Sequence, residues 1–209
     1  MGKYSCFEHL RANESRGADF EVRRRRGGSG IAVISIHGGT IEPGTSEVAE
    51  AVAGADHSFY TFRGMKKAGN QDLHITSTIF DEPDALEIVR CSETVISIHG
   101  CSGEEEFVHV GGIDFRLREC IEERLRQAGF KTPRRLWSLR GLDKRNICNL
   151  CRRGMGVQLE ISKGLRARMF GDLSYGADLQ CSGTFNEFIH AVRKAIDPFK
   201  IPVEKNHFQ

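Results

Sequence analysis

The chain has 209 residues, of which 39% are hydrophobic and 28% charged, a composition typical of a soluble globular protein. The 30 lysines and arginines are nearly balanced by 28 aspartates and glutamates, so the formal net charge of +2 does not indicate a polyanion-binding surface. No run of roughly 18 apolar residues occurs, and the start of the chain lacks the apolar core of a signal peptide, which argues against a membrane partner and predicts a cytoplasmic location. We expect one domain over residues 1–209, and a monomer.

Residues 1–30 are polar and contain four consecutive arginines, Arg23 to Arg26, before a run of glycine and serine. Such a run occurs in nucleic-acid-binding and nuclear-import patches, which leaves a nucleic-acid-associated protein as an alternative. The rest of the chain is not basic and lacks the interleaved aromatic and basic residues of single-strand binders. We therefore expect a solvated loop and no nucleic-acid partner. Residues 198–209 contain two prolines and are expected to form a loosely held tail.

The seven cysteines are odd in number and scattered along the chain, which argues for reduced thiols rather than a disulfide framework. Cys148 and Cys151 have the spacing of half a zinc clip or of a redox pair. No second pair of this kind accompanies them, so we interpret them as packing or surface cysteines.

Short apolar runs alternate with amphipathic segments along the rest of the chain, and glycine, proline or polar residues separate them. Branched and aromatic residues favour strands in the short runs, whereas helical periodicity marks the longer segments. This alternation predicts an α/β sheet with helices on both faces. The predicted strands are residues 31–36, 58–63, 73–78, 94–99, 107–110 and 157–161, and the predicted helices are residues 45–53, 81–89, 115–128 and 185–196.

One hexapeptide, Val-Ile-Ser-Ile-His-Gly, occurs twice, from Val33 to Gly38 and from Val95 to Gly100. Each copy predicts a short buried strand that ends in a histidine, followed by a glycine that lets the chain leave the sheet. Sites in open α/β sheets lie at the carboxyl ends of the strands. We therefore expect His37 and His99 at two strand exits, where two imidazoles on neighbouring strands could hold one metal ion.

Two glutamates complete a candidate metal site. Glu42 follows His37 by five residues across a glycine-rich turn, and such a loop can fold back to bring a third ligand to the ion. Glu160 lies near the end of the strand 157–161 and is the candidate acceptor for a proton from metal-bound water, as in a metal-dependent amide hydrolase. The alternative interpretation is that the histidines are structural and hydrogen-bonded, and that Glu42 is solvated.

Several blocks of sequence resemble, in the same order, the phage and bacterial poly-γ-glutamate hydrolase family, some members of which are labelled phage-related replication proteins. The resemblance implies a single catalytic domain with a zinc carboxypeptidase-like fold, in which a mixed, mostly parallel sheet is flanked by helices. The blocks run from His37 to Glu47, from Leu73 to Thr78, from Val95 to Gly100 and from Gly156 to Ser162.

By this resemblance the ligands of a Zn²⁺ ion are His37, Glu42 and His99, and the catalytic carboxylate is Glu160. Zinc carboxypeptidases generally space the first His and Glu as HxxE, whereas the spacing here is HxxxxE, so Glu47 is the alternative ligand. The implied activity is hydrolysis of γ-glutamyl amide bonds by a metal-activated water.

The implied substrate is an anionic γ-glutamyl polymer or peptide, and arginine can hold each of its α-carboxylates with two hydrogen bonds. An Asn-Arg pair is expected before the last strand, but Asn149 is followed by Leu150. Arg166 is the favoured arginine because it follows the Glu160 strand closely, and His74 and His109 are candidates to line the cleft or orient a ligand. The candidate arginines are Arg63, Arg140, Arg145, Arg152 and Arg166, of which Arg145 and Arg152 could replace the arginine of the pair.

Three functions follow from the sequence. The first is a zinc-dependent amidohydrolase of poly-γ-glutamate. The second is a small N-acyl-glutamate or peptide amidase that uses the same zinc site. The third, from another class, is a non-enzymatic nucleic-acid-associated phage protein anchored by Arg23 to Arg26.

Overall fold

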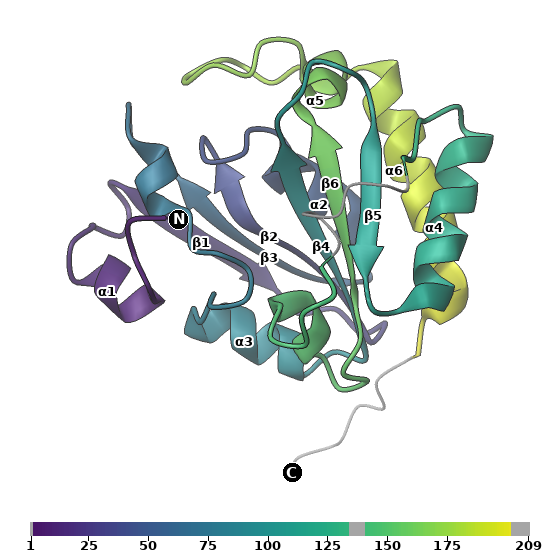
Figure 1. Cartoon of the computed structure of the whole chain (residues 1–209), viewed down its shortest axis with the longest axis horizontal. Coiled ribbons are helices and arrows are strands. Elements are labelled where there is room, and N and C mark those ends of the chain that lie inside the picture. Colours follow the sequence, from purple (N-terminus) through teal and green to yellow (C-terminus); the bar gives the residue numbers. More distant parts are fainter. Residues whose placement is uncertain (1, 134–140, 202–209) are drawn as a thin grey trace.

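The computed structural model describes residues 2–133 and 141–201 of the chain (Figure 1). Its centre is a six-stranded sheet in the order β1-β3-β2-β4-β6-β5. The four inner strands are parallel, and the edge strands β1 and β5 are antiparallel to their neighbours, which confirms the mixed, mostly parallel sheet. The strands are β1 (Phe20–Arg25), β2 (Ile31–Gly39), β3 (Ser58–Gly64), β4 (Thr94–Cys101), β5 (Val108–Gly112) and β6 (Val157–Ser162).

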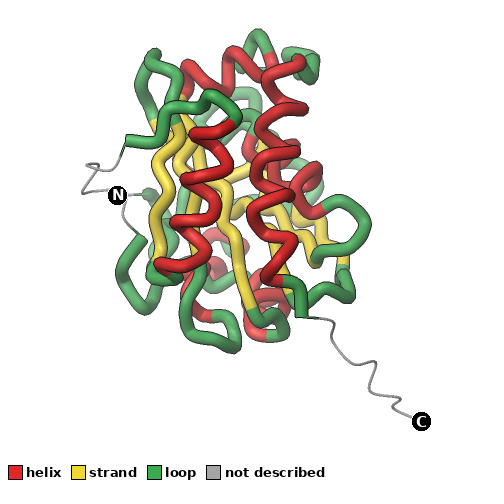
Figure 2. The backbone as a smooth tube through the Cα atoms, turned by 90° about the vertical axis from the view of Figure 1, so that its right-hand side faces the viewer, coloured by secondary structure: helices red, strands yellow, loops and turns green. Residues whose placement is uncertain are grey.

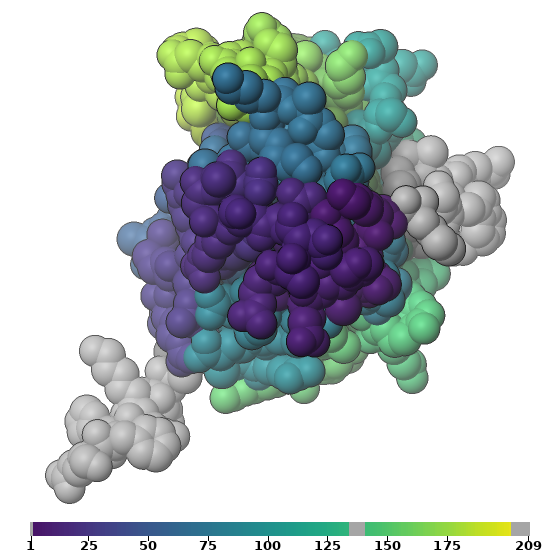
Figure 3. Space-filling model, turned by 90° about the vertical axis from the view of Figure 1, so that its left-hand side faces the viewer, coloured from purple at the N-terminus to yellow at the C-terminus, as the bar shows by residue number. Residues whose placement is uncertain are grey.

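Helices cover both faces of the sheet. On one face α2 (Thr45–Ala53), α4 (Phe115–Gln127), α5 (Lys163–Phe170) and α6 (Gly183–Ile196) form one apolar core with the strands, and in Figure 2 helices of this side lie in front of the sheet. On the other face α1 (Phe7–Arg11) and α3 (Pro83–Arg90) form a second core. Figure 3 shows the N-terminal residues, in purple, over the side of the molecule that carries α1. Three 3₁₀ turns complete the described elements: η1 (Asn70–Leu73), η3 (Ile147–Leu150) and η4 (Asp197–Phe199).

Most of the predicted elements are present within a few residues of their expected bounds. Cys148 and Cys151 are buried in the core beside α3, as expected for packing cysteines, and all seven cysteines are free. None of the described helices is long and apolar enough to span a membrane.

The helices α1 and α5 were not predicted from the sequence. The helix α5 begins directly after β6, where the hydroxyl of Ser162 accepts a hydrogen bond from the backbone N–H of Leu165 and caps the helix.

The predicted strand 73–78 is wrong. Leu73 ends η1, and the residues after it form turns that join no strand. Leu73 and Ile75 are nevertheless fully buried in the core beside α3. Their alternating apolar pattern therefore reflects the packing of an irregular segment rather than its pairing in the sheet.

The arginine run is also not the solvated loop that we predicted. Residues 20–25 form the edge strand β1, which Phe20 anchors in the core and which pairs with β3. Three of the four arginines form ion pairs with acidic side chains, two of which come from α3, and the fourth donates to a main-chain carbonyl. Because the charges are paired within the protein, the nucleic-acid alternative is weakened. The contacts are Arg23 with Glu21, Arg24 with Asp84 and Glu87, Arg25 with the carbonyl of Gly54, and Arg26 with Glu87.

The two copies of the repeated hexapeptide lie on the adjacent strands β2 and β4, but one residue out of register. Val33 pairs with Ile96 rather than with Val95, its equivalent in the second copy. A slip of one residue reverses the face to which a side chain points, and Val33 accordingly packs into the core beside α2 whereas Val95 packs into the core beside α3. Without a break in β2, this register would direct His37 and His99 to opposite faces of the sheet.

A β-bulge in β2 brings the two histidines together. Between Ser35 and Gly38 the strand β2 advances three residues while β3 advances two, from Thr61 to Arg63. The extra residue changes the direction of the side chains beyond it. As a result, the ring centroids of His37 and His99 lie only 5.1 Å apart.

The glycine at the end of the bulge has no room for a side chain. A Cβ on Gly38 would lie 2.0 Å from Ser46 Oγ and 2.6 Å from Thr61 Oγ1. We predict that Gly38→Ala lowers the free energy of unfolding by about 1–3 kcal/mol, the usual cost of overpacking, in urea denaturation. The control is Gly28→Ala, because a Cβ on Gly28 meets nothing within 4 Å, and this variant should change stability by less than about 0.5 kcal/mol. Equal stabilities of the two variants would contradict the tight packing of the bulge.

Candidate active site

The carboxyl ends of β2, β4 and β6 open into a cavity of about 670 Å³. His37, His99 and Glu160 line it from these three strands, and Glu42 lines it from the loop between β2 and α2. The remaining walls come from residues 74–78, which follow η1, and from residues 141–146, which precede η3. The four residues predicted to carry the metal chemistry therefore share one cavity.

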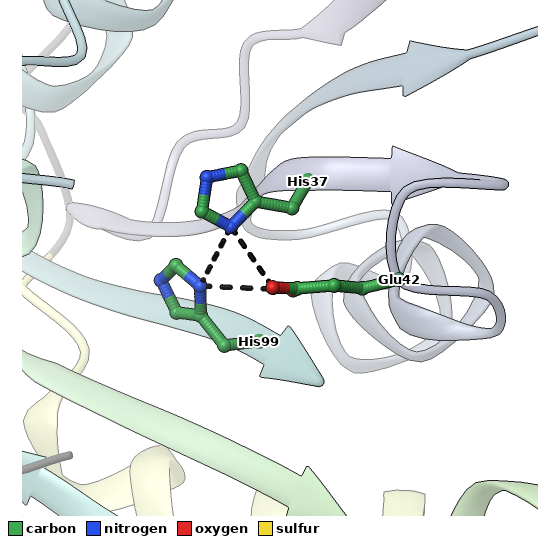
Figure 4. A group of neighbouring side chains, drawn as sticks. All are labelled: His37, Glu42 and His99. Carbon is green, nitrogen blue, oxygen red and sulfur yellow. Dashed lines mark hydrogen bonds and ion pairs between the residues drawn. The ribbon is translucent and has the colours of Figure 1, made fainter. Parts of the chain in front are cut away.

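His37, Glu42 and His99 turn one ligand atom each toward the others, and these atoms all lie within 4.8 Å of one another (Figure 4). His37 Nδ1 lies 3.1 Å from Glu42 Oε1 and 3.2 Å from His99 Nδ1. His99 Nδ1 lies 3.8 Å from Glu42 Oε2. The three side chains come from two strands and one loop, so the fold, not local sequence, assembles them.

Hydrogen bonds hold each of the three side chains in this orientation. His37 Nε2 lies 2.8 Å from the main-chain carbonyl of Ile75, and since a carbonyl only accepts, Nε2 carries a proton and Nδ1 faces the cluster. His99 Nε2 lies 2.9 Å from the hydroxyl of Ser97. The backbone N–H of Gly100 donates to Glu42 Oε2 at 2.8 Å. Such contacts behind the ligand atoms are typical of metal-binding histidines and carboxylates.

His74 extends the cluster toward the cavity wall. Its ring stacks on His37, with centroids 3.7 Å apart and an interplanar angle of 22°. Its Nε2 lies 3.7 Å from Glu42 Oε1. The structure thus places this predicted cleft residue next to two of the candidate metal ligands.

The ionisation of the cluster depends on burial and on neighbouring charge. Burial raises the pKa of Glu42, but His37, His74 and His99 outweigh burial and hold this pKa well below its ordinary value. Burial lowers the pKa of His99 to about 3, which makes this imidazole neutral near pH 7. The buried carboxylate of Glu42 is therefore stable only beside a positive charge, whether a protonated imidazole or a metal cation.

Glu160 has a different environment although it lines the same cavity. Its side chain is buried, and its Oε1 accepts a hydrogen bond of 2.7 Å from Gln158 Nε2. Burial and the negative charge of Glu42 together raise the pKa of Glu160 to about 8, although the positive charge of Arg166 opposes this rise. A carboxyl group with a pKa near neutral can both accept and return a proton.

His99, Glu160 and His109 form a row across three strands, because Glu160 pairs with His99 of β4 on one side and with His109 of β5 on the other. His109 does not line the cavity. Its Nδ1 donates to the carbonyl of Pro133 at 2.8 Å, and its buried Nε2 has no hydrogen-bond partner within the described part of the chain.

Two of the predicted substrate-binding residues, Asn149 and Arg145, lie behind or within the loop of residues 141–146. Asn149 is buried behind it and donates to the carbonyls of Gly141 and Asp143, so its amide orders the wall rather than faces the cavity. Arg145 is exposed and forms an ion pair of 2.7 Å with Asp143, which does line the cavity.

The remaining candidate residues lie elsewhere. Glu47 and Arg63 line a second cavity and pair with each other at 3.5 Å, so Glu42, not Glu47, meets the two histidines. Arg152 pairs with Glu93 away from the cavity. Arg166 is buried and does not line the cavity. Arg140 lies outside the described residues.

Gln158 and Asn146 are among the polar residues of the cavity that were not predicted from the sequence. Gln158 precedes Glu160 by two residues on the same strand, and side chains at this spacing point to the same face, so the strand period could have identified it. Asn146 donates to Gln158 Oε1 at 2.7 Å. No sequence signal relates this loop residue to β6.

The raised pKa of Glu160 predicts how the stability of the metal-free protein depends on pH. Since the folded pKa of about 8 lies above the ordinary value of 4.5, the folded state binds more protons than the unfolded state between these values. The contribution of Glu160 to stability is therefore complete below about pH 4.5 and falls as the pH rises to about 8, by at most about 1.4 kcal/mol per pH unit. Glu160→Gln should remove this decline, which urea denaturation in excess chelator at several pH values would measure. Parallel stability curves for the variant and the unchanged protein would contradict the raised pKa.

The chain is similar to proteins of one family. A family model described as poly-gamma-glutamate hydrolase matches residues 4–191. UPF0714 protein YndL of Bacillus subtilis (strain 168) is 42% identical to this chain over 175 residues, which cover 82% of this chain and 68% of YndL.

Two solved structures superpose closely on this one. A bacteriophage poly-gamma-glutamate hydrolase has a TM-score of 0.90 and 30% identity, and the superposition covers 95% of this chain and 98% of that chain. A zinc-free apo structure of YndL also has a TM-score of 0.90, with 37% identity, and covers 96% of this chain and 100% of that chain.

Proposed function

The chain belongs to the poly-γ-glutamate hydrolase family, and from this premise we propose that it is a zinc-dependent amidohydrolase that cleaves the γ-glutamyl amide bonds of poly-γ-glutamate. One observation carries the proposal. His37, Glu42 and His99 turn their ligand atoms toward one another in the cavity that Glu160 also lines. The description "zinc-free" given to the apo form of the similar protein YndL supports the choice of metal.

The donor set fits zinc. Two imidazole nitrogens and one carboxylate oxygen are ligands of catalytic zinc sites, which keep a further position open. The imidazole nitrogens lie 3.2 Å from each other, and one lies 3.1 Å from Glu42 Oε1 and the other 3.8 Å from Glu42 Oε2. These separations suit a carboxylate and two imidazoles that bind one ion through bonds of about 2.0–2.2 Å. Without a cation or a shared proton, the nitrogen lone pairs of His37 and His99 would oppose each other at 3.2 Å. A divalent cation removes this repulsion and neutralises Glu42.

Zinc in such a site polarises a carbonyl group and lowers the pKa of water to about 7. Glu160 takes the proton from the attacking water and passes it to the departing amine, which is a poor leaving group unless it is protonated. Gln158 holds the carboxylate for this transfer through its hydrogen bond to Oε1. A cation in the cavity also favours the ionised form of Glu160, which keeps it basic near neutral pH.

Substrate carboxylates would meet neutral donors at the cavity wall, because no lysine or arginine is among its described lining residues. Hydroxyl groups of Thr76, Ser77 and Thr78 line this wall. Of the predicted arginines among the described residues, Arg145 forms an ion pair with a lining residue, and we propose that it leaves Asp143 to bind a carboxylate at the rim. His74 would orient the substrate beside Glu42.

We predict that purified protein contains one zinc per chain and that His99→Ala contains little or none, because the variant lacks one of three protein ligands. Elemental analysis measures both values. The matched control is His190→Ala, which changes an exposed histidine of α6 and should keep the full zinc content. Equal, negligible zinc in the unchanged protein and in His99→Ala would contradict the site.

We further predict that Glu160→Gln keeps its zinc but hydrolyses poly-γ-glutamate roughly 10²- to 10⁴-fold more slowly, since it can no longer transfer the proton. The assay follows the chain length of the polymer by gel electrophoresis, with and without chelator. Chelator should stop the unchanged enzyme, and added zinc should restore it. A variant as fast as the unchanged enzyme would exclude Glu160 as the base.

A panel of short γ-glutamyl and N-acyl-glutamate substrates separates polymer hydrolysis from the activity of a small amidase. We expect the polymer to be the better substrate. Faster cleavage of the short compounds would favour the small amidase on the same zinc site.

A further inference from the structure

The guanidinium group of Arg166 binds main-chain carbonyls from three separate segments at the site. Its Nε donates to the carbonyl of Ile161 at 3.2 Å, its Nη1 to that of Pro43 at 2.8 Å, and its Nη2 to that of Cys101 at 3.2 Å. Ile161 follows Glu160, Pro43 follows Glu42, and Cys101 is two residues after His99. One planar group thus connects the backbone beside three of the four residues of the proposed site.

The strand end at His99 is shaped to receive this group. A Cβ on Gly100 would lie 2.7 Å from the guanidinium carbon of Arg166 and 2.9 Å from its Nε. The backbone N–H of the same glycine donates to Glu42 Oε2. Gly100 therefore lies between Glu42 and Arg166 and contacts both through its main chain.

The contacts of Arg166 differ from those of an arginine that waits for a substrate carboxylate. All three kinds of guanidinium nitrogen already donate to carbonyl oxygens, and the side chain is buried outside the cavity lining. It forms no ion pair with any carboxylate in the described ranges, although Glu42 and Glu160 interact with its charge at longer range. A planar fork of five donors can satisfy several carbonyls at once, which a lysine ammonium group cannot do with the same geometry.

We propose that Arg166 is a positioning residue, which fixes the distances between Glu42, His99 and Glu160 by tying together the three backbone segments that carry them. The inference rests on the proposed zinc site and assigns Arg166 a different role from the substrate binding that its place in the sequence suggests. Groups that orient metal ligands from behind usually contribute about 10- to 100-fold to metal affinity.

The test is the zinc affinity of Arg166→Lys, measured by competition with a chromogenic chelator and without any assay of activity. Lysine keeps the charge but cannot bridge the three carbonyls, so the dissociation constant should rise about 10- to 100-fold. The value of kcat on a γ-glutamyl substrate should fall, with KM changed by less than about threefold. The control is Arg168→Lys, on the same helix, where the exposed arginine pairs with Glu106 and the affinity should not change.

Gly100→Ala provides a second variant, in which Arg166 itself is not substituted. Its methyl group would displace the guanidinium group, so it should weaken zinc binding as well. Both substitutions disrupt the same contacts of the Arg166 guanidinium group. The double variant, Arg166→Lys with Gly100→Ala, should therefore raise the zinc dissociation constant by less than the product of the fold-increases in the two single variants. If Arg166→Lys does not fold, as judged by circular dichroism, Gly100→Ala decides the question alone.

Unchanged zinc affinity in both folded variants would overturn the proposal. A rise in KM at unchanged kcat and zinc affinity would also overturn it, and would assign Arg166 to substrate binding. If the unchanged protein itself neither binds zinc nor cleaves γ-glutamyl bonds, the proposed function fails first. The two failures are therefore distinguishable.

Discussion

The extra residue of β2 between Ser35 and Gly38 is the constraint on which the candidate site depends. The two copies of the hexapeptide pair one residue out of register, and a regular strand would turn their histidines to opposite faces of the sheet. The bulge turns His37 toward His99, and the loop that follows returns Glu42 to both, since its backbone N–H donates to the carbonyl of His37. Bulges beside active sites commonly redirect one side chain in this way. Here the redirected side chain is that of His37, one of the two imidazoles of the candidate site.

Burial then gives the two carboxylates of the cavity opposite character. Glu42 is surrounded by imidazoles that lower its pKa, so it remains an anion and suits a cation. Burial and the neighbouring charge of Glu42 raise the pKa of Glu160 to about 8, which suits proton transfer. A pair of acids whose pKa values are separated by their environments is the usual basis for assigning different roles to them. Arg166, held by carbonyls of three segments, contributes the compensating positive charge and ties the segments together.

Local signals in the sequence were sufficient to predict most strands and helices, and they also identified the two histidines and two glutamates that converge in the cavity. The strand-His-Gly repeat and the glycine-rich turn before Glu42 depend on residues close together in the chain. The register of β2 and β4 could not be predicted, because identical sequences give no sign of a slip of one residue. The edge strand β1 was missed because its arginines resemble a solvated run until α3 supplies their acidic partners. The carbonyl contacts of Arg166 could not be predicted because its closeness in sequence to Glu160 does not reveal the direction of its guanidinium group.

We propose that two histidines and one glutamate bind a single zinc ion. X-ray absorption spectroscopy of the zinc-loaded protein at the zinc edge tests it most directly, since the spectrum distinguishes nitrogen and oxygen ligands at about 2.0–2.2 Å from sulfur ligands at about 2.3 Å. We expect the zinc-loaded protein to contain one zinc per chain with two imidazole ligands, further oxygen ligands and no sulfur ligand. Sulfur ligation, for example by Cys101 or by Cys148 and Cys151, or a spectrum without imidazole scattering would contradict it.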